Sequence, residues 1–175
     1  MRVCDDLMNN FEDKEKGGFF FTSNQHEQLF YRPKSISDDS VPSGLVYATD
    51  TLLYMGFISG NQKYIEAAHG ALDFIYKSID DNLTSSVSAI NLLREDNLEK
   101  EIIIVRTNKK TWKKITDSEE YYGRCIIFIE NELQNLPDYI AYKESKGEFT
   151  SYHCKGMTCQ TPKLSFEDFI DTLKT

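Results

Sequence analysis

Apolar positions recur every three or four residues through much of the first hundred residues, the spacing of helices with one buried face. Four helices are expected there: one over residues 2–11, one capped by Pro42-Ser43 and ending near Gly56 to Gly60, one capped by Asn61, and one after Asp80-Asp81-Asn82. The residues expected on the buried face are, for the four helices in chain order, Val3, Leu7 and Phe11; Leu45, Ala48, Thr49, Leu52 and Met55; Tyr64, Ala68, Leu72, Ile75 and Ile79; and Leu83, Val87, Ile90 and Leu93.

The pattern changes near residue 100. The continuous apolar runs at 102–105 and 125–129 are rich in β-branched residues and typical of buried strands. A helix expected at 109–117, with its loops, is long enough to connect them in parallel. A third strand is expected at 149–154, before a last helix capped by Ser165. These elements predict a small βαβ-type unit.

A β-hairpin is expected at residues 18–33, between the first two helices. Two glycines just before it permit a turn with positive φ. The run Phe19-Phe20-Phe21 then faces Leu29-Phe30-Tyr31 across a polar tip that carries His26 and Glu27.

Charged residues of both signs gather around this hairpin. The candidate ligand-binding residues are His26, Glu27, Arg32, Lys34 and Asp38. A carboxylate, an imidazole and cations together can bind hydroxyl-rich or anionic ligands and transfer protons. The alternative, which composition alone favours, is that the aromatic residues are core and the charges are solvated. No motif identifies catalytic residues, since the chain has no nucleophile elbow, phosphate loop or dinucleotide fingerprint.

Cys154 and Cys159, with His153 beside them, are the close set of soft metal ligands in the chain. A zinc ion normally takes four ligands, and no second pair at a suitable spacing completes such a set. We therefore expect no metal and no cofactor, with these two cysteines as the candidates if a metal does bind. Their spacing also differs from the Cys-x-x-Cys of redox sites, so reduced thiols with a structural role are expected.

Two stretches resemble a known family. They are Gly17-Gly18-Phe19-Phe20-Phe21-Thr22 with His26-Glu27, Leu29, Arg32, Lys34, Asp38 and Pro42-Ser43-Gly44, and then Ser151-Tyr152-His153-Cys154 with Cys159 and Pro162. They look like the late segment of the thioredoxin-like spermatogenesis-associated family, in which a thioredoxin-like domain precedes an α/α toroid similar to N-acylglucosamine 2-epimerases and six-hairpin glycosidases. The resemblance implies the last hairpins of such a toroid, without the thioredoxin-like domain and the early hairpins.

The expected fold class is mainly α with an α/β appendage. Residues 1–98 would form a partial α/α toroid of the six-hairpin glycosidase type with the β-hairpin inserted, and residues 99–175 the small α/β region. The resemblance implies a carbohydrate-related function that is inactive without the missing N-terminal segments. The alternative is a non-catalytic binding or assembly module. An open apolar flank predicts a homo-oligomer or docking onto the missing N-terminal part, and a sugar-like ligand is a further expected partner.

Charge and hydropathy exclude two kinds of partner. The formal net charge is −8, with most of the acidic excess in the first hundred residues, which argues against nucleic acid. No apolar run is long enough to cross a bilayer, so no membrane association is expected. The first residues lack the order of a secretory signal, and we expect a cytoplasmic protein.

Overall fold

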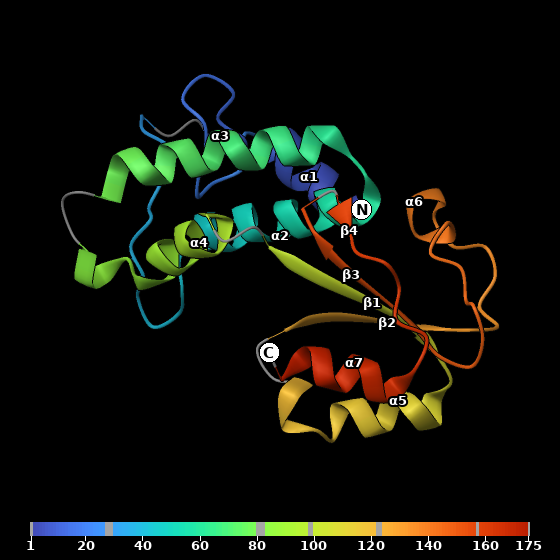
Figure 1. Cartoon of the computed structure of the whole chain (residues 1–175). Coiled ribbons are helices and arrows are strands. Elements are labelled where there is room, and N and C mark those ends of the chain that lie inside the picture. The colour runs from blue at the N-terminus through green and yellow to red at the C-terminus, as the bar shows by residue number, and fades with distance from the viewer. Residues whose placement is uncertain are drawn as a thin grey trace. The chain divides into compact units, whose positions relative to one another are not determined.

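The computed structural model describes residues 2–26, 30–79, 83–97, 100–121, 124–156 and 158–174. The chain divides into two compact units, Met1–Leu98 (unit 1) and Glu99–Thr175 (unit 2). Unit 1 is helical outside its loops, whereas unit 2 combines helices with a mixed sheet (Figure 1). The expectation of a mainly α chain with a β-containing appendage is thereby confirmed. None of the described helices is long and apolar enough to span a membrane.

The helices of unit 1 are α1 (Arg2–Phe11), α2 (Gly44–Ser59), α3 (Gln62–Ser78), the 3₁₀ helix η2 (Leu83–Ser85) and α4 (Val87–Asn97). Helices α2 and α3 begin where their capping residues predict, whereas α4 begins at Val87, after the short 3₁₀ helix. The Ser43 side chain accepts a hydrogen bond from the N–H of Val46, and the Asn61 side chain accepts one from the N–H of Lys63. Each cap satisfies an N–H group that the first turn of its helix leaves without an intrahelical acceptor.

The core of unit 1 forms mainly between α2 and α3. The predicted apolar face of α3 is confirmed, because Tyr64, Ala68 and Ile75 are almost fully buried. A Cβ atom at Gly56 would lie 2.6 Å from Cγ1 of Ile65, so the glycine in α2 permits the close approach of α3. Small residues at a helix contact let the two axes come near each other, which favours dense packing.

The predicted buried face of α4 is wrong except at Leu93, which packs against the core of unit 1. Val87 and Ile90 are exposed, and Ala89 and Leu92 are buried in their place. The carboxylate of Asp38 accepts hydrogen bonds from the N–H and the hydroxyl of Ser88 in the first turn. This contact with a loop fifty residues upstream fixes how α4 is rotated about its axis, which local periodicity does not reveal.

The predicted β-hairpin at 18–33 is also wrong over the part of that range that the structure describes, since no strand is formed there. Phe19 instead forms an isolated antiparallel bridge with Glu12. The two expected arms share the hydrogen bond from the N–H of Phe21 to the carbonyl of Pro33. Arg32, near the end of the second expected arm, directs its guanidinium to the main-chain carbonyls of Thr22 and Asn10.

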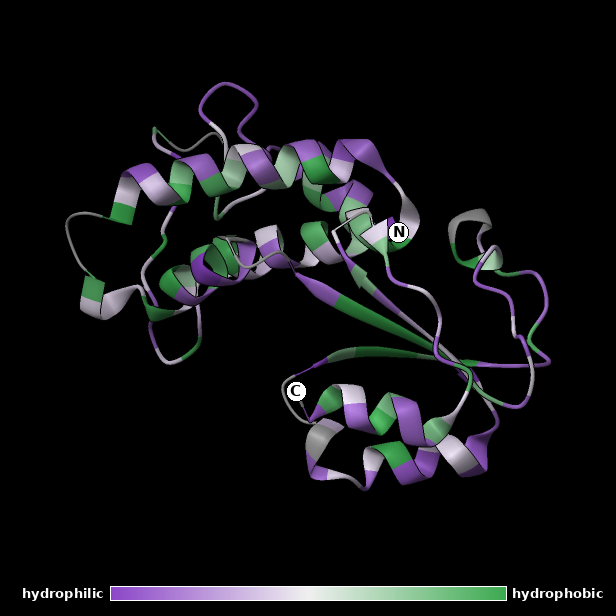
Figure 2. Ribbon diagram, viewed as in Figure 1, coloured by the Kyte–Doolittle hydropathy of each residue, from purple (hydrophilic) through white to green (hydrophobic). Residues whose placement is uncertain are grey.

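Unit 2 contains the predicted βαβ arrangement. Its elements are β1 (Glu101–Thr107), α5 (Lys109–Thr116), the 3₁₀ helix η3 (Glu119–Tyr121), β2 (Cys125–Glu130), α6 (Asp138–Ala141), β3 (Thr150–Lys155), β4 (Thr158–Cys159) and α7 (Phe166–Leu173). The strand order is β2-β1-β3-β4, with β1 parallel to β2 and antiparallel to β3. Hydrophobic residues run along β1 and β2, as Figure 2 shows.

Helices α5 and α7 cover one face of this sheet (Figure 1). Ile103 and Val105 of β1 point to that face and pack with Ile115 of α5 and Phe169 of α7. The alternate residues of β1 and their register partners, including Tyr152 and Cys154 of β3, point to the opposite face. Both faces of β1 and β3 therefore carry buried side chains.

Candidate functional site

The candidate residues lie in the segment 19–43 that connects the turn after α1 with α2, which we call the tether loop. His26 is exposed, and its N–H donates to the carbonyl of Ser23 at 3.3 Å. Glu27 lies outside the residues that the structure describes. Among the described residues, no hydrogen bond or ion pair joins the His26 side chain to Arg32, Lys34 or Asp38, so its imidazole lies apart from them.

Arg32 ties the tether loop to the end of α1. Its Nη2 and Nε donate to the carbonyl of Thr22 at 2.5 and 3.2 Å, and Nη2 also donates to the carbonyl of Asn10 at 3.2 Å. The guanidinium carbon lies 4.1 Å from the centroid of the Phe20 ring, within the range of a cation–π contact. The Arg32 side chain thus joins the carbonyls of Asn10 and Thr22 to the ring of Phe20.

Lys34 makes the second attachment. Its Nζ donates to Oδ2 of Asp13 at 2.6 Å and to the carbonyl of Gly17 at 2.8 Å, and it lies 4.0 Å from the centroid of the Phe74 ring in α3. The two charged side chains are each only 10% exposed. Burial alone would raise the pKa of Asp13, but hydrogen bonds from Lys34 and from backbone N–H groups outweigh it and lower that pKa below its usual value.

Asp38 makes the third attachment, between the starts of two helices. Its carboxylate accepts from the N–H of Ser43 at 3.0 Å and from the N–H of Ser88 at 2.8 Å, as well as from the hydroxyl of Ser88. Burial acts to raise the pKa of Asp38, and these hydrogen bonds reverse the effect, so that the pKa is lowered. An ionised carboxylate near two helix N-termini is stabilised by the backbone dipoles as well.

The structure therefore brings only part of the predicted set together. Arg32 and Lys34 share the ring of Phe20, at 4.1 and 5.5 Å from its centroid, whereas Asp38 is engaged with Ser43 and Ser88. All three charged groups use their polar atoms on partners within unit 1. As arranged, they hold the tether loop in place and leave little capacity for proton transfer to a substrate.

Sequence reasoning missed Asp13, the counter-ion of Lys34. Its Oδ1 accepts from the N–H groups of Glu15 and Lys16, both at 3.1 Å, which closes a turn directly after α1. An aspartate four residues before a glycine pair is a recognisable turn signal, because its side chain can bond to the backbone two residues on. The surrounding charge run concealed this signal.

A groove of about 500 Å³ lies along the tether loop. It is lined by Leu7, Phe11, Phe19, Phe20, Phe21, Ser35, Ser37, Asp39, Val41, Pro42, Ser43, Gly44, Leu45 and Ala48. Phe21 is 79% exposed and Val41 is 69% exposed, so apolar side chains stand open to solvent there. Ser35, Ser37 and the carboxylate of Asp39 add polar groups to the same lining.

The expectation of reduced thiols at the C-terminal cysteines is wrong, since Cys154 and Cys159 form a disulfide. They face each other as register partners in the β3–β4 ladder, which brings their side chains to the same face. Cys4 and Cys125 are not disulfide-bonded. In the part of the chain that the structure describes, no group of three or more His, Cys, Asp or Glu residues is placed to hold a metal ion.

The fold and the site define a two-unit protein in which a helical unit carries an apolar groove and a mixed-sheet unit carries a disulfide. No protein-family model matches the chain. Curated proteins likewise include no sequence that matches it.

Proposed function

We propose that unit 1 is a non-catalytic binding module that holds a sugar-like ligand in the groove beside the tether loop. One observation carries the proposal: Arg32 packs on the ring of Phe20 and Asp38 accepts from the N–H of Ser43, so these charged residues hold two residues of the groove lining in place. The chain acts in this proposal as a binding part and not as a complete enzyme.

The chemistry of the groove supports a sugar as its ligand. The exposed ring of Phe21 offers a flat apolar surface on which the C–H face of a sugar ring can stack. Asp39 and the serines at 35 and 37 offer acceptors and donors for hydroxyl groups on the same lining. Binding sites for small molecules commonly combine an apolar wall with a few polar groups in this way.

We further propose that the α2–α3 pair corresponds to one of the last hairpins of an α/α toroid. The close packing at Gly56 and the caps at Ser43 and Asn61 are consistent with a regular helical hairpin. In that architecture the remaining hairpins would belong to a separate segment.

Assembly is the second candidate function, favoured by the exposed apolar side chains of the same region. Phe30, Val41 and Phe21 are among the most exposed large hydrophobic residues of the chain. Exposed apolar surface of this kind is typical of contact sites between proteins. The occupant would be a second copy or the segment that supplies the other hairpins.

Titration with glucose, N-acetylglucosamine and their disaccharides, followed by two-dimensional NMR, tests the proposed function. We expect shifts for backbone amides of the groove lining, and a loss of affinity of about fivefold in Phe21→Ala because ring stacking is removed. Tyr31→Ala is the matched control, since Tyr31 is 74% exposed on the same loop but is not part of the lining.

Two results would count against sugar binding: no shift of groove amides with any of these sugars, or the same effect from both variants. Light scattering on the same samples separates the second candidate. If wild-type protein is larger than its 20.2 kDa monomer and Phe21→Ala restores the monomer, the groove serves assembly.

A further inference from the structure

The disulfide of unit 2 joins a buried cysteine to an exposed one. Cys154 lies in β3 and is 6% exposed, whereas Cys159 lies in β4 at the end of the sheet and is exposed. The strands are connected by a short turn, in which the hydroxyl of Thr158 donates to the carbonyl of Lys155 at 3.1 Å. An external reagent therefore has easier access to the sulfur of Cys159 than to that of Cys154.

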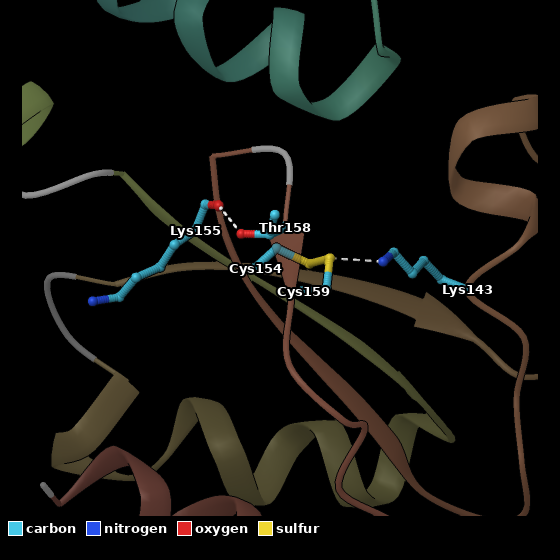
Figure 3. The surroundings of a disulfide bond; sticks show 5 residues. All are labelled: Lys143, Cys154, Lys155, Thr158 and Cys159. Carbon is cyan, nitrogen blue, oxygen red and sulfur yellow. Dashed lines mark hydrogen bonds between the residues drawn. A yellow bond between two sulfur atoms is a disulfide. The ribbon is translucent and has the colours of Figure 1, made fainter.

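A buried lysine points at the exposed end of this disulfide. Nζ of Lys143 donates to Sγ of Cys159 at 2.7 Å, as Figure 3 shows. Lys143 is only 5% exposed, and its Nζ lies 4.5 Å from the centroid of the Tyr142 ring and 5.1 Å from that of the Tyr152 ring. The ammonium group is thus held against one sulfur by two aromatic rings.

Within the described residues, no carboxylate forms an ion pair with Lys143. A buried cation that lacks an anion is costly, because it has lost its hydration without gaining a charged partner. A thiolate at Cys159 would supply the missing negative charge. The surroundings of the disulfide are therefore better suited to its reduced form, with Cys159 ionised, than to a purely structural crosslink.

The position of Lys143 is fixed by its neighbours. Its N–H donates to the carbonyl of Ile140 at 2.9 Å, and its own carbonyl accepts from Nη1 of the buried Arg106 at 3.4 Å. The hydroxyl of Tyr152 donates to the carbonyl of Glu144 at 2.8 Å, which places the ring beside Lys143. A preorganised cation stabilises a thiolate more effectively than a mobile surface lysine does.

We propose that Cys154, Cys159 and Lys143 form a thiol–disulfide exchange site, at which Cys159 reacts with external disulfides and Cys154 resolves the mixed disulfide. Its substrate class is a disulfide compound in one direction and a thiol reductant in the other. This site is independent of the groove in unit 1.

In the reduced protein the thiolate of Cys159 attacks one sulfur of a disulfide RS–SR′. The bond from Sγ of Cys159 to that sulfur forms, the S–S bond of the substrate breaks, and R′S⁻ leaves with the electron pair and takes a proton from solvent. Cys154 then loses its proton to solvent and attacks Sγ of Cys159, which expels RS⁻. Two protein thiols are oxidised to a disulfide, and one external disulfide is reduced to two thiols.

The two cysteines outside the disulfide provide a contrast within the same chain. Cys4 is buried in the core of unit 1, and burial raises the pKa of its thiol. Cys125 is partly buried and lies in β2. We expect exchange to be concentrated at Cys159, because its sulfur accepts a hydrogen bond from the Lys143 ammonium group.

The first test compares two single-cysteine variants of the pair with glutathione disulfide at pH 7. In Cys154→Ser the resolving thiol is absent, so a mixed disulfide should accumulate at Cys159. In Cys159→Ser the remaining thiol at position 154 is buried, and its reaction should be at least about tenfold slower. Trypsin cleaves after Lys155, so peptide mass spectrometry assigns the adduct to one cysteine or the other. Equal rates in the two variants would overturn the proposal.

The second test addresses the lysine in the Cys154→Ser background. Lys143→Met should slow the reaction of Cys159 with iodoacetamide at pH 7 by about tenfold, and Lys143→Arg should retain most of the rate because it keeps the charge. Lys146→Met is the matched control, since it removes an exposed cation from the same loop. Equal rates in Lys143→Met and Lys146→Met would refute the role of Lys143. If Lys143→Met loses the native fluorescence of Trp112, the arginine variant and the cysteine comparison decide.

Discussion

At the scale of single residues, the turn after α1 depends on Gly17. Its φ of +71° is rarely adopted by residues with a side chain, and a Cβ atom there would lie 2.1 Å from the carbonyl oxygen of Gly70 in α3. The same turn presents the Gly17 carbonyl to Lys34. Gly17 therefore permits the close contact with α3, and its carbonyl also binds Lys34 of the tether loop.

Replacement of this glycine should be among the most destabilising single changes in unit 1. We expect Gly17→Ala to reduce the free energy of unfolding by at least about 2 kcal/mol, from the positive φ and the clash with backbone. The measurement is urea denaturation followed by circular dichroism at 222 nm. Gly44→Ala is the control, because a Cβ atom there meets nothing within 4 Å and alanine favours the first turn of α2. Equal stability of the two variants would contradict the packing described.

At the scale of elements, β3 organises unit 2, because it pairs with β1 and β4 and is buried on both faces. On one face His153 lies with its ring 5.7 Å from that of Phe169 in α7. On the other face β3 carries Tyr152 and Cys154 toward the exchange site. One short strand thus links the helix-covered core to the disulfide.

The buried histidine of β3 makes the stability of unit 2 sensitive to acid. Burial lowers the pKa of His153, with Lys163 and Arg124 acting in the same direction and Glu101 against it. The unfolded chain binds a proton below about pH 6.5 while the folded chain does not, so stability should be constant above that pH and fall as the pH drops below it.

Fluorescence of Trp112 is the appropriate probe for this effect. It is the single tryptophan of the chain and stacks on Phe128 at 4.9 Å within unit 2. His153→Gln should flatten the loss of stability between about pH 6.5 and 5, and His26→Ala should not, because His26 is exposed. If wild type and His153→Gln lose stability in parallel, His153 does not contribute to the acid sensitivity.

At the scale of the whole molecule, what could be predicted from sequence was local. Caps at Ser43 and Asn61 and the apolar run at 102–105 are signals carried by neighbouring residues, and the structure confirms the corresponding elements. The hairpin at 18–33 and the buried face of α4 failed because they depend on contacts between distant residues. The contacts formed in their place are those of Arg32 with the carbonyls of Thr22 and Asn10, and of Asp38 with Ser88.

The candidate site follows the same division. Its residue types were recognisable, since Arg32, Lys34 and Asp38 stand out as charges near aromatic residues. Their roles were not, because a carboxylate in a site and a carboxylate that joins two helices have the same sequence signature. Likewise, the pairing of Cys154 with Cys159 follows from the β3–β4 register, and the approach of Lys143 from the chain that precedes β3.

The contacts of Arg32, Lys34 and Asp38 predict that these charged residues maintain the structure of the tether loop. Native-state hydrogen exchange of the whole chain, comparing Lys34→Met with Lys77→Met, tests it most directly. Lys34→Met removes the ion-pair partner of the buried Asp13 carboxylate. The N–H groups of Phe21 and Gly17 should then exchange at least about thirtyfold faster. Loss of the exposed Lys77 should change their exchange little. Unchanged protection in Lys34→Met would contradict the account and return Lys34 to the set of candidate ligand-binding groups.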